Sequence, residues 1–118
     1  MEDNLLNKKC VPCTGKELPL EGEKLQQLVS QLPAGWHIKE ERLYLEKSYS
    51  FSNFAEALHF TNAVGEIAER EGHHPTIILS WGKVTLQIWT HKIKGLSEND
   101  FILAAKCDQS FSKYKAIQ

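Results

Sequence analysis

The spacing of apolar residues predicts a helix near the start of the chain and another at its end. Between residues 22 and 32, leucine and valine recur at helical spacing among Glu, Lys and Gln, and Pro33 and Gly35 follow. Near the C-terminus, Leu96 and Ser97 open a similar pattern. Its apolar members are Phe101, Ala104, Ala105 and Phe111, with Tyr114 as a further candidate.

A longer helix is predicted in the middle of the chain. Ser52 or Asn53 can cap its first turn, and Gly72 can end it in a left-handed conformation. The apolar stripe expected to face the core consists of Phe54, Ala57, Leu58, Thr61, Val64 and Ala68.

Two hairpins are predicted from alternating apolar and polar positions. The first joins residues 36–39 to residues 43–51 around a charged turn. The second joins residues 76–81 to residues 84–91, which are rich in β-branched and aromatic side chains, through a two-residue turn at Gly82-Lys83.

This second turn sets a register. Counting outward from it places Trp81 opposite Val84 and His74 opposite His91. Directly opposed residues have Cβ atoms about 4.5 to 5.5 Å apart, so both imidazoles could address one small ligand. By alternation, His73 is expected to point elsewhere.

The predicted order is α-β-β-α-β-β-α. Two hairpins separated by helices favour an α+β fold with a four-stranded antiparallel sheet and helices packed on one face. The length of 118 residues suffices for one core, so we expect a single domain over residues 21–118. Residues 1–20 carry Pro and Gly with no sustained period, and are expected to form a loosely ordered N-terminal arm.

Composition and charge exclude several classes of function. A net charge of -1 gives no general attraction to nucleic acid or to an anionic membrane. No apolar run could span a bilayer, and residues 1–4 lack the features of a signal peptide. The cysteine count of 3 fits reduced thiols rather than a disulfide framework. We therefore expect a cytoplasmic protein that binds neither nucleic acid nor membranes.

Three of the 5 histidines come close together in the predicted fold, namely His73, His74 and His91. Imidazole has an ordinary pKa of about 6.5 and can donate or accept a proton near neutrality. The three histidines are therefore a candidate proton-transfer site. The alternative is that they are polar surface residues without a chemical task.

Two carboxylates could serve these histidines. Glu69 lies four residues before His73 at the C-terminal end of the long helix, where the helix dipole disfavours a negative charge. An interaction with an imidazole would account for a carboxylate at this position. Asp100 either completes a capping box opened by Ser97 or reaches the histidines across the short loop after His91.

Two other classes of function compete with proton transfer. Cys10 and Cys13 form a Cys-x-x-Cys motif, which could complete a tetrahedral zinc site with His73 and His74. That second pair lacks a diagnostic spacing, so we expect no metal. The other class is a protein-interaction module in which the histidines are incidental.

The candidate residues stand at a fixed spacing: Glu69, His73-His74-Pro75, Trp81, His91 and Asp100. The tract from Thr90 to Asp100, with Gly95-Leu96-Ser97 inside it, adds to this pattern. Together they resemble the signature of the pterin-4a-carbinolamine dehydratases. The resemblance covers residues 25–110.

The resemblance implies the same α-β-β-α-β-β-α fold and the dehydration of 4a-hydroxytetrahydropterins to quinonoid dihydropterins. This hydro-lyase reaction belongs to tetrahydrobiopterin recycling and uses no metal or other cofactor. The resemblance gives proton transfer to His73 and His91 and pterin binding chiefly to His74, and leaves open which histidine is the acid. Substrate-binding or orienting roles fall on Glu69, Asp100, Trp81 and Thr90.

Two further expectations accompany the resemblance. Animal members carry an acidic residue before the histidine pair and a basic residue before the aspartate, where this chain has Gly72 and Asn99. Contacts to the pterin side chain, and the animal role as a transcriptional coactivator, therefore transfer poorly. The sheet leaves two exposed edges, and members of the family associate as dimers or tetramers. Together these predict a homodimer or homotetramer.

Overall fold

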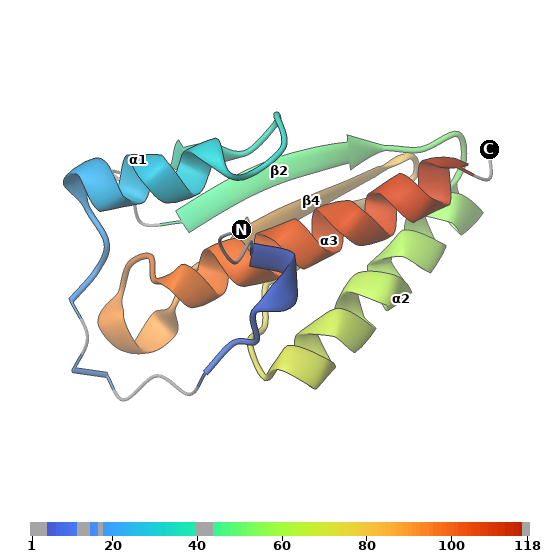
Figure 1. Cartoon of the computed structure of the whole chain (residues 1–118). Helices are drawn as coiled ribbons and strands as arrows, with labels where there is room; N and C mark the ends of the chain where they lie inside the picture. The colour runs from blue at the N-terminus through green and yellow to red at the C-terminus, as the bar shows by residue number, and fades with distance from the viewer. Residues whose placement is uncertain (1–4, 12–14, 17, 40–43, 117–118) are drawn as a thin grey trace.

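The computed structural model describes residues 5–11, 15–16, 18–39 and 44–116, and it has the predicted α+β fold (Figure 1). Its α-helices within those ranges are α1 (Gly22–Ser30), α2 (Phe54–Glu71) and α3 (Glu98–Ala116). Its strands are β1 (His37–Lys39), β2 (Tyr44–Ser50), β3 (Thr76–Ser80) and β4 (Lys83–Ile88). Two 3-10 helices also occur, η1 (Leu5–Asn7) and η2 (His91–Ile93).

The four strands form one antiparallel sheet in the order β1-β2-β4-β3. The helices lie on one face of this sheet, as the sequence predicts (Figure 1). The central strand β4 supplies three fully buried side chains to the core, Val84, Leu86 and Ile88. The turn between β1 and β2 lies outside the described residues. Within the described part of the chain, no helix is long and apolar enough to cross a membrane.

Helix α2 has the predicted ends but not all of the predicted core face. The side chain of Asn53 accepts a hydrogen bond of 2.8 Å from a first-turn amide. Phe54 and Leu58 were expected in the core, yet they are 44% and 41% exposed. Phe60 and Ile67 are buried in their place. The two exposed positions flank the buried face, so the predicted stripe was centred part of a turn away from it.

The predicted register of the second hairpin is wrong by two positions. Leu79 pairs with Val84, so the two turn residues are Trp81 and Gly82. The carbonyl oxygen of Gly82 accepts a hydrogen bond of 2.8 Å from the Phe51 amide, which extends the pairing of β2 with β4. A Cβ at Gly82 would lie 3.0 Å from the Phe51 oxygen, which is a tight contact, so the close backbone approach favours glycine here.

The corrected register changes where the histidines lie. A shift of two residues leaves each strand's faces unchanged, but it removes the predicted pairing of His74 with His91. Strand β3 begins only after Pro75, which has no amide to donate, and β4 ends at Ile88. His91 therefore lies in η2 rather than on a strand.

A buried polar cluster fastens α3 to the sheet. The Asp108 carboxylate accepts hydrogen bonds from Trp36 Nε1 at 2.6 Å, Tyr49 Oη at 2.7 Å and Lys47 Nζ at 2.7 Å. Burial, and then the neighbouring Asp108 carboxylate, raise the pKa of Tyr49 well above its ordinary value. The tyrosine therefore stays a neutral donor at physiological pH.

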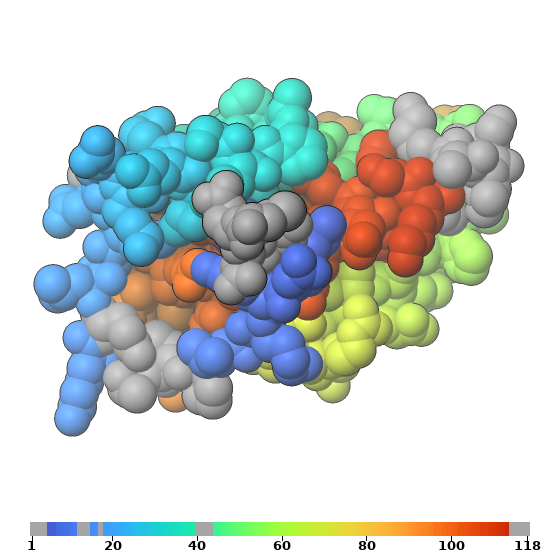
Figure 2. All heavy atoms as spheres, in the orientation of Figure 1, coloured from blue at the N-terminus to red at the C-terminus, as the bar shows by residue number. Residues whose placement is uncertain are grey.

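Part of the expected N-terminal arm is packed against the helices. Leu5 is only 3% exposed and belongs to the core. In Figure 2 the blue atoms of residues 5–11 lie across the orange start of α3 and beside the yellow end of α2. The division of the chain into an arm and a domain at residue 20 stays a prediction.

Candidate active site

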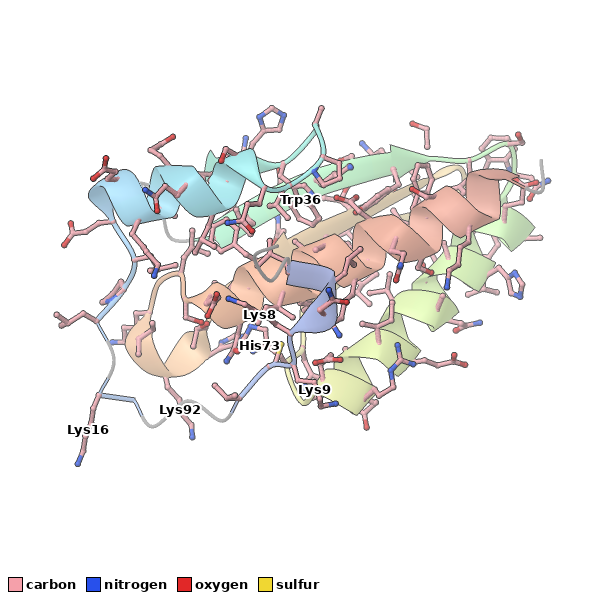
Figure 3. The ribbon with its side chains drawn as sticks, viewed as in Figure 1. Lys8, Lys9, Lys16, Trp36, His73 and Lys92 are labelled. Atoms are coloured by element: carbon pink, nitrogen blue, oxygen red, sulfur yellow. The ribbon has the colours of Figure 1, made fainter. Side chains whose placement is uncertain are left out.

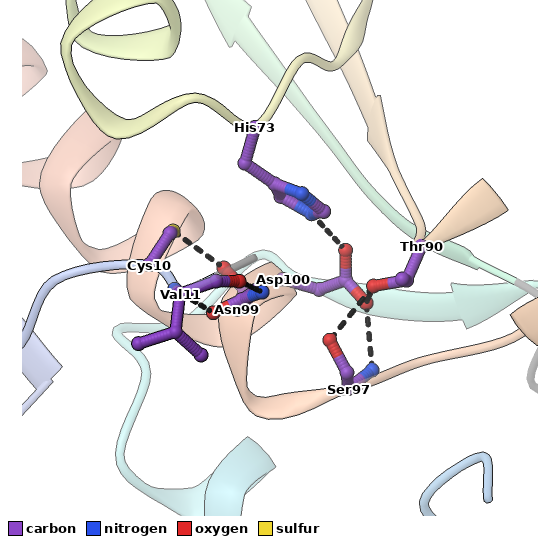
Figure 4. Close-up of polar contacts among 7 residues, drawn as sticks. All are labelled: Cys10, Val11, His73, Thr90, Ser97, Asn99 and Asp100. Carbon is purple, nitrogen blue, oxygen red and sulfur yellow. Dashed lines mark hydrogen bonds and ion pairs between the residues drawn. The ribbon is translucent and has the colours of Figure 1, made fainter. Parts of the chain in front are cut away.

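His73 follows α2 directly and is fixed there by the way the helix ends. Gly72 has a φ of 69°, the left-handed conformation that ends many helices. The amides of Gly72 and His73 both donate to the Ala68 carbonyl, at 2.9 and 3.2 Å. Helix α3 supplies the partner, because His73 Nε2 lies 2.6 Å from Asp100 Oδ1 (Figure 4).

Asp100 is fully buried, and its second oxygen is also satisfied. Asp100 Oδ2 accepts from the Ser97 amide at 2.8 Å and from Thr90 Oγ1 at 2.9 Å (Figure 4). Thr90 donates its only hydroxyl proton there, so Ser97 Oγ must be the donor in its 2.7 Å bond to Thr90 Oγ1. Asp100 therefore combines the two sequence interpretations: one oxygen accepts from the Ser97 amide, as in a capping box, and the other binds His73. The reciprocal half of the box is absent among the described contacts, because the Ser97 hydroxyl bonds Thr90 and the Asp100 amide donates to the Ser97 backbone carbonyl.

This network determines which nitrogen of His73 is free. An ionised carboxylate only accepts hydrogen bonds, so opposite an ionised Asp100 the His73 Nε2–H is the donor. In the neutral imidazole, Nδ1 is then the unprotonated nitrogen. A histidine held in this way can act chemically as a general base or, once protonated, as a general acid.

The other two histidines are more exposed. His74 Nε2 lies 2.6 Å from Glu69 Oε2, and the two side chains are 59% and 78% exposed. Glu69 therefore pairs with His74 rather than with His73. His91 is exposed at the start of η2, where its ring lies 4.5 Å from the Trp89 ring, centroid to centroid.

A cavity of about 610 Å³ joins these elements. Five of the seven predicted site residues line it: Glu69, His73, His74, Thr90 and His91. Asp100 lies behind His73 and reaches the cavity through that ring. Trp81, also predicted, is 69% exposed at the hairpin turn and is not among the described residues that line the cavity. The volume lies within the common range of about 300 to 1,000 Å³ for small-molecule sites.

Eight lining residues were not predicted as site residues. Four of them come from the N-terminal segment and the start of α3: Lys9, Cys10, Val11 and Asn99. In Figure 3 the labelled Lys9 and Lys92 lie on either side of His73. The sequence offered only weak signals for these positions, the Cys-x-x-Cys motif and the Asn that precedes Asp100. Neither signal belongs to a pattern of apolar residues that would place it on a helix or a strand beside the histidines.

The zinc alternative is left untested by the structure. Cys13 lies outside the described residues, and within those residues no three His, Cys, Asp or Glu side chains are grouped as a metal site. Elemental analysis of the purified protein decides the question, because a structural zinc site would give stoichiometric metal.

Comparison with known proteins shows the family of the chain. The family model described as pterin 4 alpha carbinolamine dehydratase matches residues 18–110. A relative from Alkaliphilus metalliredigens is 47% identical over 111 residues, which is 94% of this chain and 99% of that protein. One from Rubrobacter xylanophilus is 50% identical over 105 residues, covering 89% of this chain and 96% of that protein. Both are named, provisionally, pterin-4-alpha-carbinolamine dehydratases.

A solved structure shares the fold. The crystal structure of a transcriptional coactivator/pterin dehydratase from Brucella melitensis superposes with a TM-score of 0.72 at 25% identity. The match covers 78% of this chain and 97% of that one. Motif, fold and sequence identity agree, and the chain belongs to the pterin-4a-carbinolamine dehydratase family.

Proposed function

We propose that this protein dehydrates 4a-hydroxytetrahydropterins to quinonoid dihydropterins. The observation that carries the proposal is the pair of His73 and buried Asp100 at the wall of a cavity that His74 and His91 also line. The reaction breaks the bond between carbon 4a and its hydroxyl group and removes a proton from the adjacent ring nitrogen. Water and the quinonoid dihydropterin are the products.

The reaction requires one group that gives a proton and one that takes a proton. An acid must protonate the departing hydroxyl, and a base must accept the proton of the ring nitrogen. We assign these tasks to His73 and His91, which approach the cavity from different elements. His74, paired with Glu69, holds the pterin, and Thr90 keeps Asp100 in place behind His73.

The test is the dehydration of a 4a-hydroxytetrahydropterin, followed by ultraviolet absorbance. His73→Ala and His91→Ala should each lower kcat by about a hundredfold to ten-thousandfold, the usual contribution of a general acid or base. The matched control is His37→Ala, because His37 is exposed on β1 at the far edge of the sheet. A loss of less than threefold in both site variants would contradict the assignment.

The competing function is a protein-interaction module of the same fold. The Brucella protein is described both as a transcriptional coactivator and as a pterin dehydratase, so the fold is compatible with either role. A wild-type protein without dehydratase activity would favour the module. An active wild-type protein that loses activity on replacement of His73 and His91 would favour the enzyme.

A place in cofactor recycling is the finer part of the proposal. A hydroxylase that consumes a tetrahydropterin releases the 4a-hydroxy adduct, and the dehydratase would return that adduct to a reducible form. A coupled assay with a pterin-dependent hydroxylase tests this. Added protein should shorten the lifetime of the adduct, and an unchanged lifetime would contradict the role.

A further inference from the structure

Residues 8–11, here called the N-terminal strap, form one wall of the cavity. Lys9, Cys10 and Val11 line the same space as the three histidines. These residues precede the segment that matches the family model, which begins at residue 18. The dehydratase signature therefore assigns them no role.

Asn99 holds the strap on α3 through two hydrogen bonds to one residue. The Val11 amide donates to Asn99 Oδ1 at 3.0 Å, and Asn99 Nδ2 donates to the Val11 carbonyl at 2.7 Å (Figure 4). The Cys10 thiol also lies 3.5 Å from the Asn99 carbonyl oxygen. Asn99 is only 8% exposed, and both ends of its amide are used by the strap.

Two carboxylates hold the strap at residues that precede Val11. The Cys10 amide donates to Glu71 Oε1 at 3.0 Å, and Lys8 Nζ lies 2.6 Å from Glu98 Oε2. Burial alone would raise the pKa of Glu71, but the Cys10 amide and the Lys106 ammonium together lower it. Glu71 is therefore a charged acceptor at neutral pH.

The strap attachments alternate along the sequence with the catalytic pair. Glu71 stands two residues before His73, and Asn99 stands directly before Asp100. At each of these two places one side chain holds the strap and its neighbour belongs to the His73–Asp100 pair. The residues that hold the strap are therefore close in sequence to His73 and Asp100, so the strap is fixed beside this pair.

We propose that the N-terminal strap is a wall that retains the pterin, and that Asn99 is the positioning residue that keeps it closed. The inference rests on the function proposed above. Val11 is 65% exposed, and it offers apolar surface at the cavity to a flat ring. Closing the wall lowers the rate at which the bound pterin escapes and leaves the proton transfers unchanged.

The first test follows the Cys10 thiol as a reporter of strap opening. Burial, followed by the charges of Glu71 and Asp100, raises the pKa of Cys10 to about 12, so the closed thiol is a poor nucleophile. Iodoacetamide labelling should therefore be slow, and 7,8-dihydrobiopterin should slow it further. Tandem mass spectrometry assigns the label to Cys10 rather than to Cys13.

Asn99→Leu removes both bonds to Val11 at nearly constant side-chain volume. Two lost hydrogen bonds should raise the labelling rate by about tenfold to a hundredfold. Gln109→Leu is the matched control, since Gln109 is an exposed amide on the same helix. An unchanged labelling rate in Asn99→Leu would overturn the proposal that Asn99 keeps the strap closed over the pterin. The absence of protection by the pterin in the wild-type protein would overturn it too.

The second test separates binding from chemistry. Asn99→Leu should raise KM by about threefold to tenfold with little change in kcat, the signature of lost substrate retention. A fall in kcat at constant KM would instead mean that Asn99 acts on Asp100, and the inference would be wrong. Val11→Pro, which removes one strap donor without altering a helix, decides the matter if Asn99→Leu does not fold.

The two proposals can fail separately. A wild-type protein that binds 7,8-dihydrobiopterin but dehydrates nothing would refute the proposed function, while the labelling experiment still tests the wall. A wild-type protein that does not bind the reduced pterin would refute both. If the wild-type protein is active and the Asn99→Leu variant has the same labelling rate and KM, only the proposal that the strap retains the pterin is refuted.

Discussion

Replacing Asp100 with asparagine tests how the carboxylate controls His73. In the native network, Oδ1 faces His73 Nε2, while Oδ2 accepts from the Ser97 amide and the Thr90 hydroxyl. An asparagine side chain has one oxygen and one amide nitrogen. Because both donors converge on the Oδ2 position, the oxygen should occupy it, and the amide nitrogen should face His73.

The magnitude follows from the tautomer that this arrangement imposes. With an NH2 group opposite, His73 Nε2 must accept, and the ring proton moves to Nδ1. The atom that should take a proton from the substrate is then blocked. The same substitution in a Ser-His-Asp triad lowers kcat by about ten-thousandfold, so we expect Asp100→Asn to lower kcat by about a hundredfold to ten-thousandfold.

The fold should survive this change. All three hydrogen bonds keep a partner, and each loses only its charge-assisted part, about 1 kcal/mol. A loss of roughly 3 kcal/mol in the free energy of unfolding is therefore the expected upper range. Asp100→Ala would leave three donors without an acceptor, so it is the less informative variant.

The assay combines kinetics with nitrogen NMR of the imidazole. The wild-type His73 should show its proton on Nε2, and Asp100→Asn should show it on Nδ1. Glu66→Gln is the control, because Glu66 is an exposed carboxylate on α2 and is not among the described residues that line the cavity. Activity within threefold of wild type in Asp100→Asn would refute the reasoning, as would an unchanged tautomer.

Three further predictions follow from other parts of the molecule. Tyr49→Phe removes a 2.7 Å bond to the buried Asp108, and should lower the free energy of unfolding in urea by about 1.5 to 3 kcal/mol; an unchanged value would show that the cluster contributes nothing. Gly72→Ala should destabilise by about 1 to 2 kcal/mol because its φ is 69°, whereas Gly65→Ala, in open space within α2, should stabilise by about 0.5 to 1 kcal/mol. Equal effects of the two glycine substitutions would contradict the helix-end argument. Light scattering should give a dimer or tetramer at micromolar concentration, since β3 is an edge strand, and the mass of one chain would rule this out.

The order of elements could be predicted because each element carries its own local pattern. Asn53 and Gly72 mark the ends of α2 by side-chain chemistry that acts within a few residues. The hairpin register could not be obtained in this way. Turns at Gly82-Lys83 and at Trp81-Gly82 are both locally reasonable, and the choice depends on Phe51, which is distant in sequence and binds the Gly82 carbonyl.

The grouping of candidate residues was predictable where a residue type has a distinctive chemistry. The sequence singled out the histidines, Glu69 and Asp100, and the structure brings the three histidines and Glu69 to one cavity with Asp100 bonded to His73. Ser97 and Asn99 could not be singled out, since a serine and an asparagine near a helix start are ordinary caps. Their tasks depend on Thr90 and Val11, which only the fold brings to them.

Thr90 links the stability of the loop between residues 90 and 95 to the position of the Asp100 carboxylate. Its backbone pairs with Gly95, where its amide donates to the Gly95 carbonyl at 2.9 Å, and its hydroxyl donates to Asp100. Opening of the loop that carries His91 therefore also releases the carboxylate behind His73. The two histidines proposed as acid and base, which lie on separate elements, would then lose their places in one cooperative local unfolding event, rather than one at a time.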